Sequence, residues 1–535
     1  MTKTFDCEIA LNRPHRAALF AAMWWIMPVV AAGAGFPVSA ADATFERPEA
    51  FTTGAPPVPV DNLSQRLHFG EATTAARPLL EPARAEGSAA DPPTGTRIAQ
   101  FARPPGPGVD FTVPELPQRL TYQYGYGSES PIRYRANSDL NQRVRDNLLV
   151  LTPQLNGYIV YRPTDWIEAL LEVIAEWDYA ALEEKVVTLP GGQTKFADKR
   201  YASLYADQAY VRIKGVTEPF EFIAGRRNFE DDRRWLYDLS LDAVTARLKL
   251  GYFHAEASIA RPDLVNLDLI KPVTKGRINY YMYYMEYRGI EDTRLAAYAI
   301  RHQDLDGTKA RPLNLGARAT GFATADLSYW GELAFLRGRD EFSRRFSGYA
   351  FDAGATYRFE GAALSPAVTL GYAYGTGNAD HGGASNHEFR QTGLESNEWR
   401  FAGISRFKTY GEALDPALTN LGILTMGFGF RPAGTISVDL VYHRYRLSEI
   451  ADGIPASAIT ARMNQVDTRL SKDVGSGLDV VVGVRELFGI RRLGLDLRTG
   501  WLFPGKAFLS YDGNGVNPGI RNPDPALAIV AKFWW

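Results

Sequence analysis

Charged side chains that fall on one face of an alternating pattern are the residues of this chain that could do chemistry, and that chemistry would be electrostatic. Between residues 167 and 177, Glu168, Glu172 and Glu176 alternate with mostly aliphatic residues. A spacing of two places side chains on one face of a β-strand. Rings of charge that line a pore set its field and its ion preference. The alternation therefore predicts the following lumen-facing residues: Glu168, Glu172, Glu176, Arg247, Lys249, Arg358, Asp439, Arg485, Asp496 and Arg498.

A second interpretation of these charges stays open, in which they only solvate the lumen and pair with their neighbours.

Motifs for catalysis are weak. Asp304-Leu-Asp306-Gly307 is a fragment of a calcium-binding loop without the remaining ligands, and we interpret it as a polar turn. His387, His443 and Asp439 show no spacing that implies a nucleophile triad. We expect no enzyme, no metal and no cofactor.

The run Glu230-Asp231-Asp232 is a cluster of like charges that could bind a divalent ion. Clusters of this kind are more often solvated, and we interpret this one as a solvated strand end. The formal net charge of -2 excludes a strongly basic surface for nucleic acid.

The elements that must position these charges are β-strands, because a period of two runs through most of residues 119–535. Charges facing lipid would cost about 2–4 kcal/mol each at mid-bilayer, so they should face a lumen. This segment has room for about sixteen to eighteen strands of roughly 10 residues plus turns and loops. The predicted fold is an all-β, antiparallel transmembrane barrel of about eighteen strands, wide enough for an aqueous channel. We expect long extracellular loops at residues 183–200, 302–313 and 375–388.

The segment 526–535 is typical of a closing barrel strand in a bacterial outer membrane. Leu527, Ile529, Ala531, Phe533 and Trp535 form an apolar face that ends in aromatic residues. One such face meets lipid, and the aromatic residues suit the membrane interface. The alternative is a buried final strand of a soluble protein.

The first 118 residues have a different composition. Residues 1–40 read as a signal peptide with a basic start, an apolar stretch and a small-residue cleavage site at Val38-Ser39-Ala40. The only cysteine, Cys7, lies there, so we expect no disulfide in the mature chain. Residues 41–118 are rich in Pro, Ala and Gly, and we predict a disordered periplasmic segment. That segment could be a spacer, a tether to a periplasmic partner or a plug for the pore.

Three patches resemble the alginate-export outer-membrane porins. The first covers residues 223–232 and continues to Asp238 and Asp242; the others cover residues 389–421 and 440–445. The resemblance implies an eighteen-stranded, monomeric barrel that lets a secreted anionic polysaccharide pass outward through an electropositive constriction. It also implies a periplasmic scaffold lipoprotein as a partner.

This chain departs from the family pattern at its arginines. Arg226 matches the first arginine of the strand-end motif, and Asp238 matches an acidic pore residue. Arg400 and Arg406, with Lys408, lie within the second patch and could replace missing cations if the register is shifted. Other expected arginines align with Thr152, Asp207, Asn228, Glu398 and Phe407. We therefore expect an export porin for alginate or a similar polymer; the alternative is a diffusion porin for small solutes.

Overall fold

The computed structural model describes residues 122–535 apart from 143–145, 184–199, 216–218, 263, 265–267, 271–276, 306–309, 381, 467–468 and 514–518. The predicted signal peptide and the predicted periplasmic segment lie outside the described residues. Among the residues that are described, no helix is long and apolar enough to cross a membrane.

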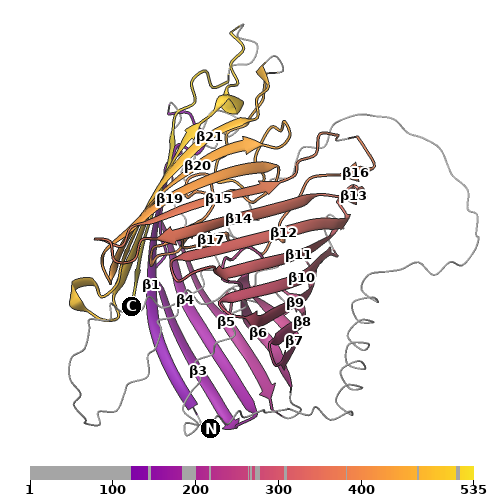
Figure 1. The fold of residues 1–535 in the computed structure, drawn as a ribbon, viewed down its shortest axis with the longest axis vertical. Coiled ribbons are helices and arrows are strands. Elements are labelled where there is room, and N and C mark those ends of the chain that lie inside the picture. The colour runs from indigo at the N-terminus through magenta and orange to yellow at the C-terminus, as the bar shows by residue number, and fades with distance from the viewer. Residues whose placement is uncertain are drawn as a thin grey trace, which may run out of the picture. The chain divides into compact units, whose positions relative to one another are not determined.

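The described chain forms a closed, antiparallel β-barrel of eighteen strands, which confirms the predicted fold (Figure 1). Each strand pairs with the next along the chain, and β1 pairs with β23 to close the ring. β2 and β3 are one barrel strand interrupted at Thr152-Pro153, and both halves pair with β1 and β4. The barrel strands are β1 (Tyr122–Ala136), β2 (Leu148–Leu151), β3 (Gln154–Thr164), β4 (Ile167–Glu183), β5 (Arg200–Lys214), β6 (Phe220–Glu230), β7 (Asp238–Leu250), β8 (Phe253–Arg261), β9 (Ile278–Ile290), β10 (Thr293–Asp304), β11 (Arg311–Phe322), β12 (Leu327–Arg339), β14 (Tyr349–Arg358), β15 (Ala367–Gly375), β19 (Leu421–Ala433), β20 (Ile436–Leu447), β21 (Asp473–Val484), β22 (Gly494–Pro504) and β23 (Ala526–Trp534).

Alternation along the strands separates an apolar outer face from a polar inner face. Tyr124 is 71% exposed and Val244 is 65% exposed, whereas Glu168 and Thr245 are fully buried. An outward apolar band flanked by aromatic residues is the surface that a bilayer requires. Phe533 and Trp535 belong to this outer face, as the pattern of the last strand predicted.

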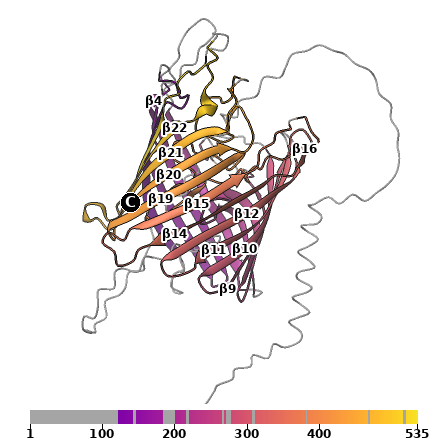
Figure 2. The same cartoon turned by 45° about the horizontal axis from the view of Figure 1, so that its top comes forward.

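The two ends of the barrel differ in the length of their connections. One end has tight turns, such as Gly251-Tyr252 and Glu291-Asp292, whereas the other carries connections of many residues. Short turns are periplasmic and long loops extracellular in barrels of this kind. The connections after β10 and after β15, which were predicted to be extracellular, are at the long-loop end. Figure 2 shows strands β9 to β22 wrapping one side of the ring.

The connection between β15 and β19, residues 376–420, folds into the barrel, and we call it the inner loop. It contains β16 (Ser385–Asn386), β17 (Glu398–Trp399) and β18 (Phe407–Lys408). β16 pairs with β13 (Arg345–Phe346) at the long-loop end. β17 and β18 form a separate two-stranded sheet, and Figure 1 shows β17 within the ring of strands.

Apolar side chains of the inner loop and of other long connections form a core inside the barrel. Leu140, Leu414, Leu418, Met463 and Phe508 are all buried in one cluster with barrel-wall residues. Burial of this kind is typical of a soluble domain, and it fixes the loops against the inner wall. The lumen is therefore partly filled, which the period of the strands does not reveal.

Candidate functional site

The connection between β6 and β7, residues 231–237, turns into the lumen, and we call it the hairpin tip. The carboxylate of Asp231 accepts hydrogen bonds from the backbone N–H groups of Leu236 and Tyr237, which folds the turn. Asp231 also forms a 2.6 Å ion pair with Arg318 of β11, and Arg233 forms one of 2.5 Å with Asp352 of β14. Ion pairs thus join the hairpin tip to the distant wall strands β11 and β14.

These contacts correct the interpretation of Glu230-Asp231-Asp232 as a solvated strand end. Asp231 is fully buried and Asp232 is 5% exposed. Asp231 and Asp232 are buried because the hairpin bends inward, where Arg318 neutralises Asp231. In the described residues, no group of three or more His, Cys, Asp or Glu side chains could hold a metal ion.

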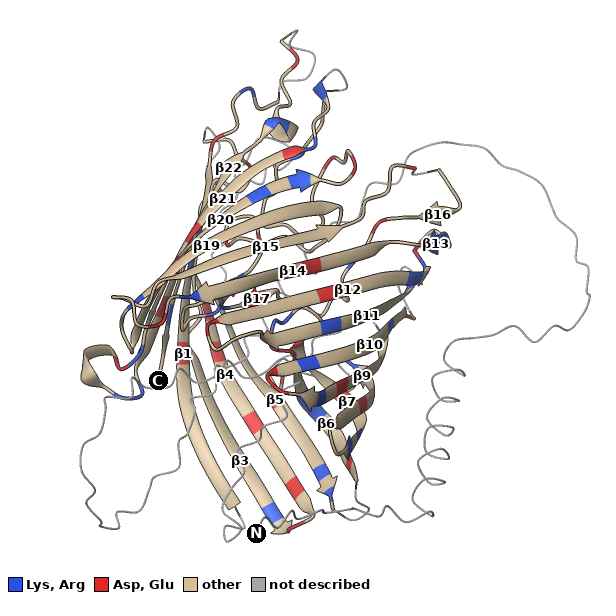
Figure 3. Ribbon diagram, in the orientation of Figure 1, with Lys and Arg blue, Asp and Glu red and all other residues tan. Residues whose placement is uncertain are grey.

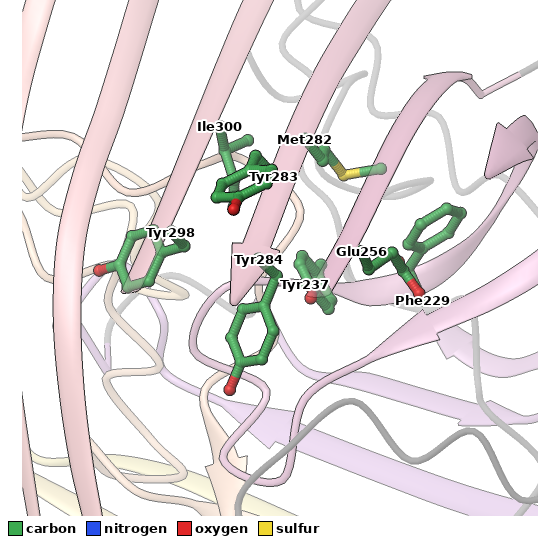
Figure 4. Close-up of a pocket in the computed structure, with 8 residues that line it drawn as sticks. All are labelled: Phe229, Tyr237, Glu256, Met282, Tyr283, Tyr284, Tyr298 and Ile300. Atoms are coloured by element: carbon green, nitrogen blue, oxygen red, sulfur yellow. The ribbon is translucent and has the colours of Figure 1, made fainter. Parts of the chain in front are cut away.

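Aromatic packing supports the hairpin tip on the side that faces β8, β9 and β10. Phe229 and Tyr237 of the hairpin stack edge to face, with ring centroids 6.0 Å apart. They border a recess of about 230 Å³ against β8, β9 and β10, and its side chains leave no space for water (Figure 4). The residues that line it are Phe229, Tyr237, Glu256, Met282, Tyr283, Tyr284, Tyr298 and Ile300.

The inner loop is bonded along the wall formed by β19 to β22. The backbone N–H of Ile404 donates to Ser437 Oγ at 2.9 Å, and Arg485 donates to the carbonyl of Ile404 at 3.0 Å. Ser405 Oγ donates to Asp496 at 2.5 Å. Since most of these bonds involve loop backbone or small side chains, the wall determines the path of the loop.

The hairpin tip and the inner loop meet across the lumen, and together we call them the lumen bridge. Trp235 Nε1 donates to Tyr410 Oη at 2.8 Å, and Tyr410 donates to Asp352 at 2.8 Å. Arg234 pairs with Glu398 of the loop at 3.0 Å. The bridge therefore occupies part of the lumen.

In the lumen bridge, several cations surround the negative charge of Glu398. Burial opposes the ionisation of this carboxyl, but Arg498, Lys408 and Arg234 outweigh burial and hold its pKa well below its ordinary value. Arg498 contacts Glu398 at 3.2 Å, so this lumen-facing prediction lies in the bridge. Asp238 lies there as well, paired with Arg234 at 3.1 Å and bonded to Ser396.

Five arginines gather where the inner loop reaches the ends of the wall strands, and we call them the arginine group. The side chains of Arg406 and Arg485 are 28% and 27% exposed, so solvent reaches them. Burial, followed by the nearby charges of Arg406 and Arg485, lowers the pKa of Arg400 to about 10, so that it remains a cation at neutral pH. Arg400 forms no salt bridge within the described part of the chain. The members of the arginine group are Arg358, Arg400, Arg406, Arg431 and Arg485.

Two acidic residues accompany the arginine group, and both were predicted to face the lumen. Asp496 pairs with Arg485 at 2.6 Å. Asp439 lies against the backbone of Gly403, where an added Cβ would come within 1.8 Å of its carboxylate oxygen. The structure thus places four residues that the alternation selected close to the inner loop: Arg358, Arg485, Asp439 and Asp496.

Another set of predicted residues lies in a belt of alternating ion pairs around the inner wall, where acidic and basic residues recur on neighbouring strands (Figure 3). Glu168 pairs with Arg212 at 2.8 Å, and Arg247 pairs with Glu256 at 2.9 Å. Glu172 accepts a hydrogen bond from Gln208 at 2.7 Å. The belt runs from β3 to β8 through Arg162, Glu168, Arg212, Glu221, Arg247, Glu256 and Arg227.

Arg226 and Asp242 face each other on β6 and β7. Two hydrogen bonds of 2.9 Å join them, and Arg226 also donates to the carbonyl of Pro262 at 3.0 Å. The structure therefore gives Arg226 a bidentate carboxylate partner, whereas Arg400 has no salt-bridge partner among the described residues.

Two important residues were missed from the sequence. Arg431 continues the alternation at the end of β19, and this signal could have found it. Arg234 lies in a turn without periodicity, so no local signal identifies it.

A buried Thr–His–Asp array supports the inner loop. Thr425 Oγ1 lies 3.0 Å from His443 Nδ1, and His443 Nε2 lies 3.2 Å from Asp479. Asp479 also accepts the backbone N–H of Glu412. All three side chains are buried, so this array connects the wall to the loop and lies away from solvent.

Comparisons with known proteins agree with this architecture. The family described as "Alginate export" matches residues 116–517. The alginate production protein AlgE of Pseudomonas syringae pv. tomato is 26% identical over 80% of this chain and 98% of its own length. The protein of the same name from Pseudomonas aeruginosa is 27% identical over 53% of this chain and 64% of its own length.

Solved barrels give weaker similarity. OccAB3 of Acinetobacter baumannii aligns over 77% of this chain and 99% of its own chain, with 10% identity and a TM-score of 0.49. OccK5 of Pseudomonas aeruginosa aligns over 77% and 98%, with 10% identity and a TM-score of 0.48.

Proposed function

This chain belongs to the alginate export family, and on that premise we propose that it is an outer-membrane porin for export of a secreted anionic polysaccharide. The cargo is alginate or an alginate-like polyuronate. Transport is passive, because the chain offers a lined passage, and the family and fold are those of a transport porin.

The observation that carries this proposal is the arginine group at the lumen bridge. A polyuronate carries a carboxylate on every sugar, and each must lose part of its hydration to enter a narrow passage. Partly exposed guanidinium groups compensate that loss, because they attract carboxylates and donate paired hydrogen bonds to them. The group lies beside the inner loop, which occupies part of the lumen, and fixed charges in a pore affect which ions pass.

The arginine group also supports export of a polyanion despite the missing family arginines. Thr152, at one such position, donates to Asp178 at 2.9 Å, and Asp207 accepts from Ser240 at 2.9 Å. Glu398, at another, lies within the lumen bridge. These positions contribute no cation, so we assign the attraction of the cargo to Arg400 and its neighbours.

We also propose that the protein works as a monomer with a periplasmic scaffold lipoprotein. Pairing of β1 with β23 lets one chain enclose a complete lumen, and the monomer itself rests on the family relationship. The scaffold rests on the family relationship alone. Analytical ultracentrifugation in detergent tests the monomeric state. Co-purification with the lipoproteins of the same secretion system tests the scaffold partner.

Planar-bilayer recording of the purified protein tests the export function. We expect a reversal potential that favours anions and a current that added polymannuronate blocks. A current that polymannuronate leaves unchanged, without anion preference, would instead support a diffusion porin for small solutes. Secreted polymer should also fall in a deletion strain and return with the wild-type gene.

A further inference from the structure

We propose that Arg234 is a positioning residue that closes the lumen bridge and thereby sets the width of the pore. The proposal rests on the porin function above, but it concerns the shape of the passage and not the identity of the cargo. It assigns a role to a residue that touches neither solute nor lipid.

The geometry around Arg234 joins three separate elements. Its guanidinium lies 3.0 Å from Glu230 at the end of β6, 3.1 Å from Asp238 at the start of β7 and 3.0 Å from Glu398 in β17. Its carbonyl accepts the backbone N–H groups of Ser396 and Asn397. One residue thus bonds both strands of the hairpin and the inner loop.

The backbone of Arg234 is held in an uncommon conformation. Its φ of 47° is in the left-handed region, which arginine seldom adopts. Such a conformation persists only where the surrounding structure enforces it. The ion pairs and the two carbonyl bonds enforce it here, which indicates that the hairpin tip is shaped around this arginine.

Charge makes Arg234 the critical member of the bridge. Burial acts against its charge, but the three surrounding carboxylates outweigh burial and raise its pKa above the ordinary value. Without the guanidinium, Glu230 keeps its ion pair with Arg406 at 2.6 Å and Glu398 keeps Arg498 at 3.2 Å, but the charge that lies between all three carboxylates is lost. The carboxylates then repel one another more strongly, so this edge of the contact between the hairpin tip and the inner loop should open.

The Arg234 contacts lie at the solvent-accessible edge of the bridge. The side chains of Glu230 and Glu398 are 22% and 18% exposed, whereas Trp235 and Tyr410, which also join the two halves, are 2% and 3% exposed. The aromatic pair therefore holds the interior of the bridge, and the ion pairs close the edge that borders the passage. Loss of the edge should widen the passage while the barrel wall stays intact.

Single-channel conductance in salt alone tests this role, so the result does not depend on any polymer. Arg234→Gln should raise conductance roughly two-fold, because the passage limits the current. Arg234→Lys keeps the charge and should stay near the wild-type value. Glu398→Gln removes one ion pair from the loop side and should give an intermediate rise; it also serves if Arg234→Gln does not fold.

The matched control is Arg344→Gln. Arg344 forms an ion pair with Asp340 at 2.7 Å, is 16% exposed, close to the 11% of Arg234, and lies outside the bridge. Heat-modifiable migration in gels verifies that each barrel is folded. Wild-type conductance in a folded Arg234→Gln channel, or an equal rise in Arg344→Gln, would overturn the proposal. Loss of polymer block with the conductance pattern intact would count only against the export function.

Discussion

At the residue scale, the inside of this barrel contains two kinds of arginine. Most are neutralised, as in the belt where Arg247 pairs with Glu221 and Glu256 at 2.9 Å. Arg400 is different, because no salt bridge within the described chain compensates its charge. An uncompensated cation produces a field in the lumen, whereas a paired one mainly stiffens the wall.

Arg400→Gln should therefore reduce the anion-to-cation permeability ratio, with little change in the stability of the barrel. The physical reason is that Arg400 forms no salt bridge within the described chain, and the nearby carboxylate of Asp232 keeps the charges of Arg406, Arg294 and Arg318. Reversal potentials under a salt gradient measure the ratio. Arg390→Gln is the control, since Arg390 is on the same loop but pairs with Glu341 at 3.0 Å. Equal losses in both variants would contradict a special role for Arg400.

Glu395 gives the inner loop a dependence on pH. Burial raises its pKa to about 7, although hydrogen bonds from Gly393 and Thr392 act in the opposite direction. The folded loop then holds a proton that the unfolded chain has released, so stability falls as pH rises from about 4.5 through 7. After correction for the intrinsic pH dependence of exchange, the hydrogen-exchange protection of residues 391–397 should be higher at pH 5 than at pH 8. In Glu395→Gln this difference should vanish; if it persists, another group is responsible.

At the scale of elements, the inner loop and the hairpin tip are the parts that turn a wide barrel into a narrow passage. Strand periodicity predicted the elements of the wall, since alternation is a local property. It could not predict the bridge, because residues 231–237 and 376–420 have no period and read as ordinary polar connections.

Shortening the tip of the inner loop should distinguish the contribution of the loop to conductance from that of the barrel wall. Replacing residues 400–406 with Asn-Gly keeps the β17–β18 pairing, since Trp399 pairs with Phe407 and a two-residue turn fits such a hairpin. Conductance should rise several-fold and anion preference should fall, because Arg400 and Arg406 are removed together with the loop that fills the lumen. Unchanged conductance in a folded barrel would place the constriction elsewhere.

At the scale of the whole molecule, the seam between the first and last strands determines whether the barrel closes. Lys532 of β23 forms an ion pair with Glu129 of β1 on the inner face, and Glu129 is 4% exposed. Trp535 exchanges backbone hydrogen bonds with Ser128 at 2.9 and 3.0 Å. The first and last strands thus share both charge and backbone pairing.

Lys532→Glu should weaken the seam by about 3–5 kcal/mol, because it places two carboxylates together in a buried position. The folded fraction after refolding from urea, read from heat-modifiable migration, should drop. The double variant Glu129→Lys with Lys532→Glu restores opposite charges and should recover most of the folded fraction. A double variant as unstable as the single one would show that the ion pair is not the cause.

The amino-acid sequence by itself determined the wall: sixteen to eighteen antiparallel strands, the apolar outer face and the inward direction of Glu168, Arg247 and Asp439. These follow from a period of two, which depends only on neighbours along the chain. The tertiary structure alone decided which charges are compensated and where the lumen narrows. Arg234 meets Glu398, and Arg318 meets Asp231, only after the hairpin tip and the inner loop fold inward. Their meeting depends on packing between segments far apart in the chain, and no local pattern encodes it.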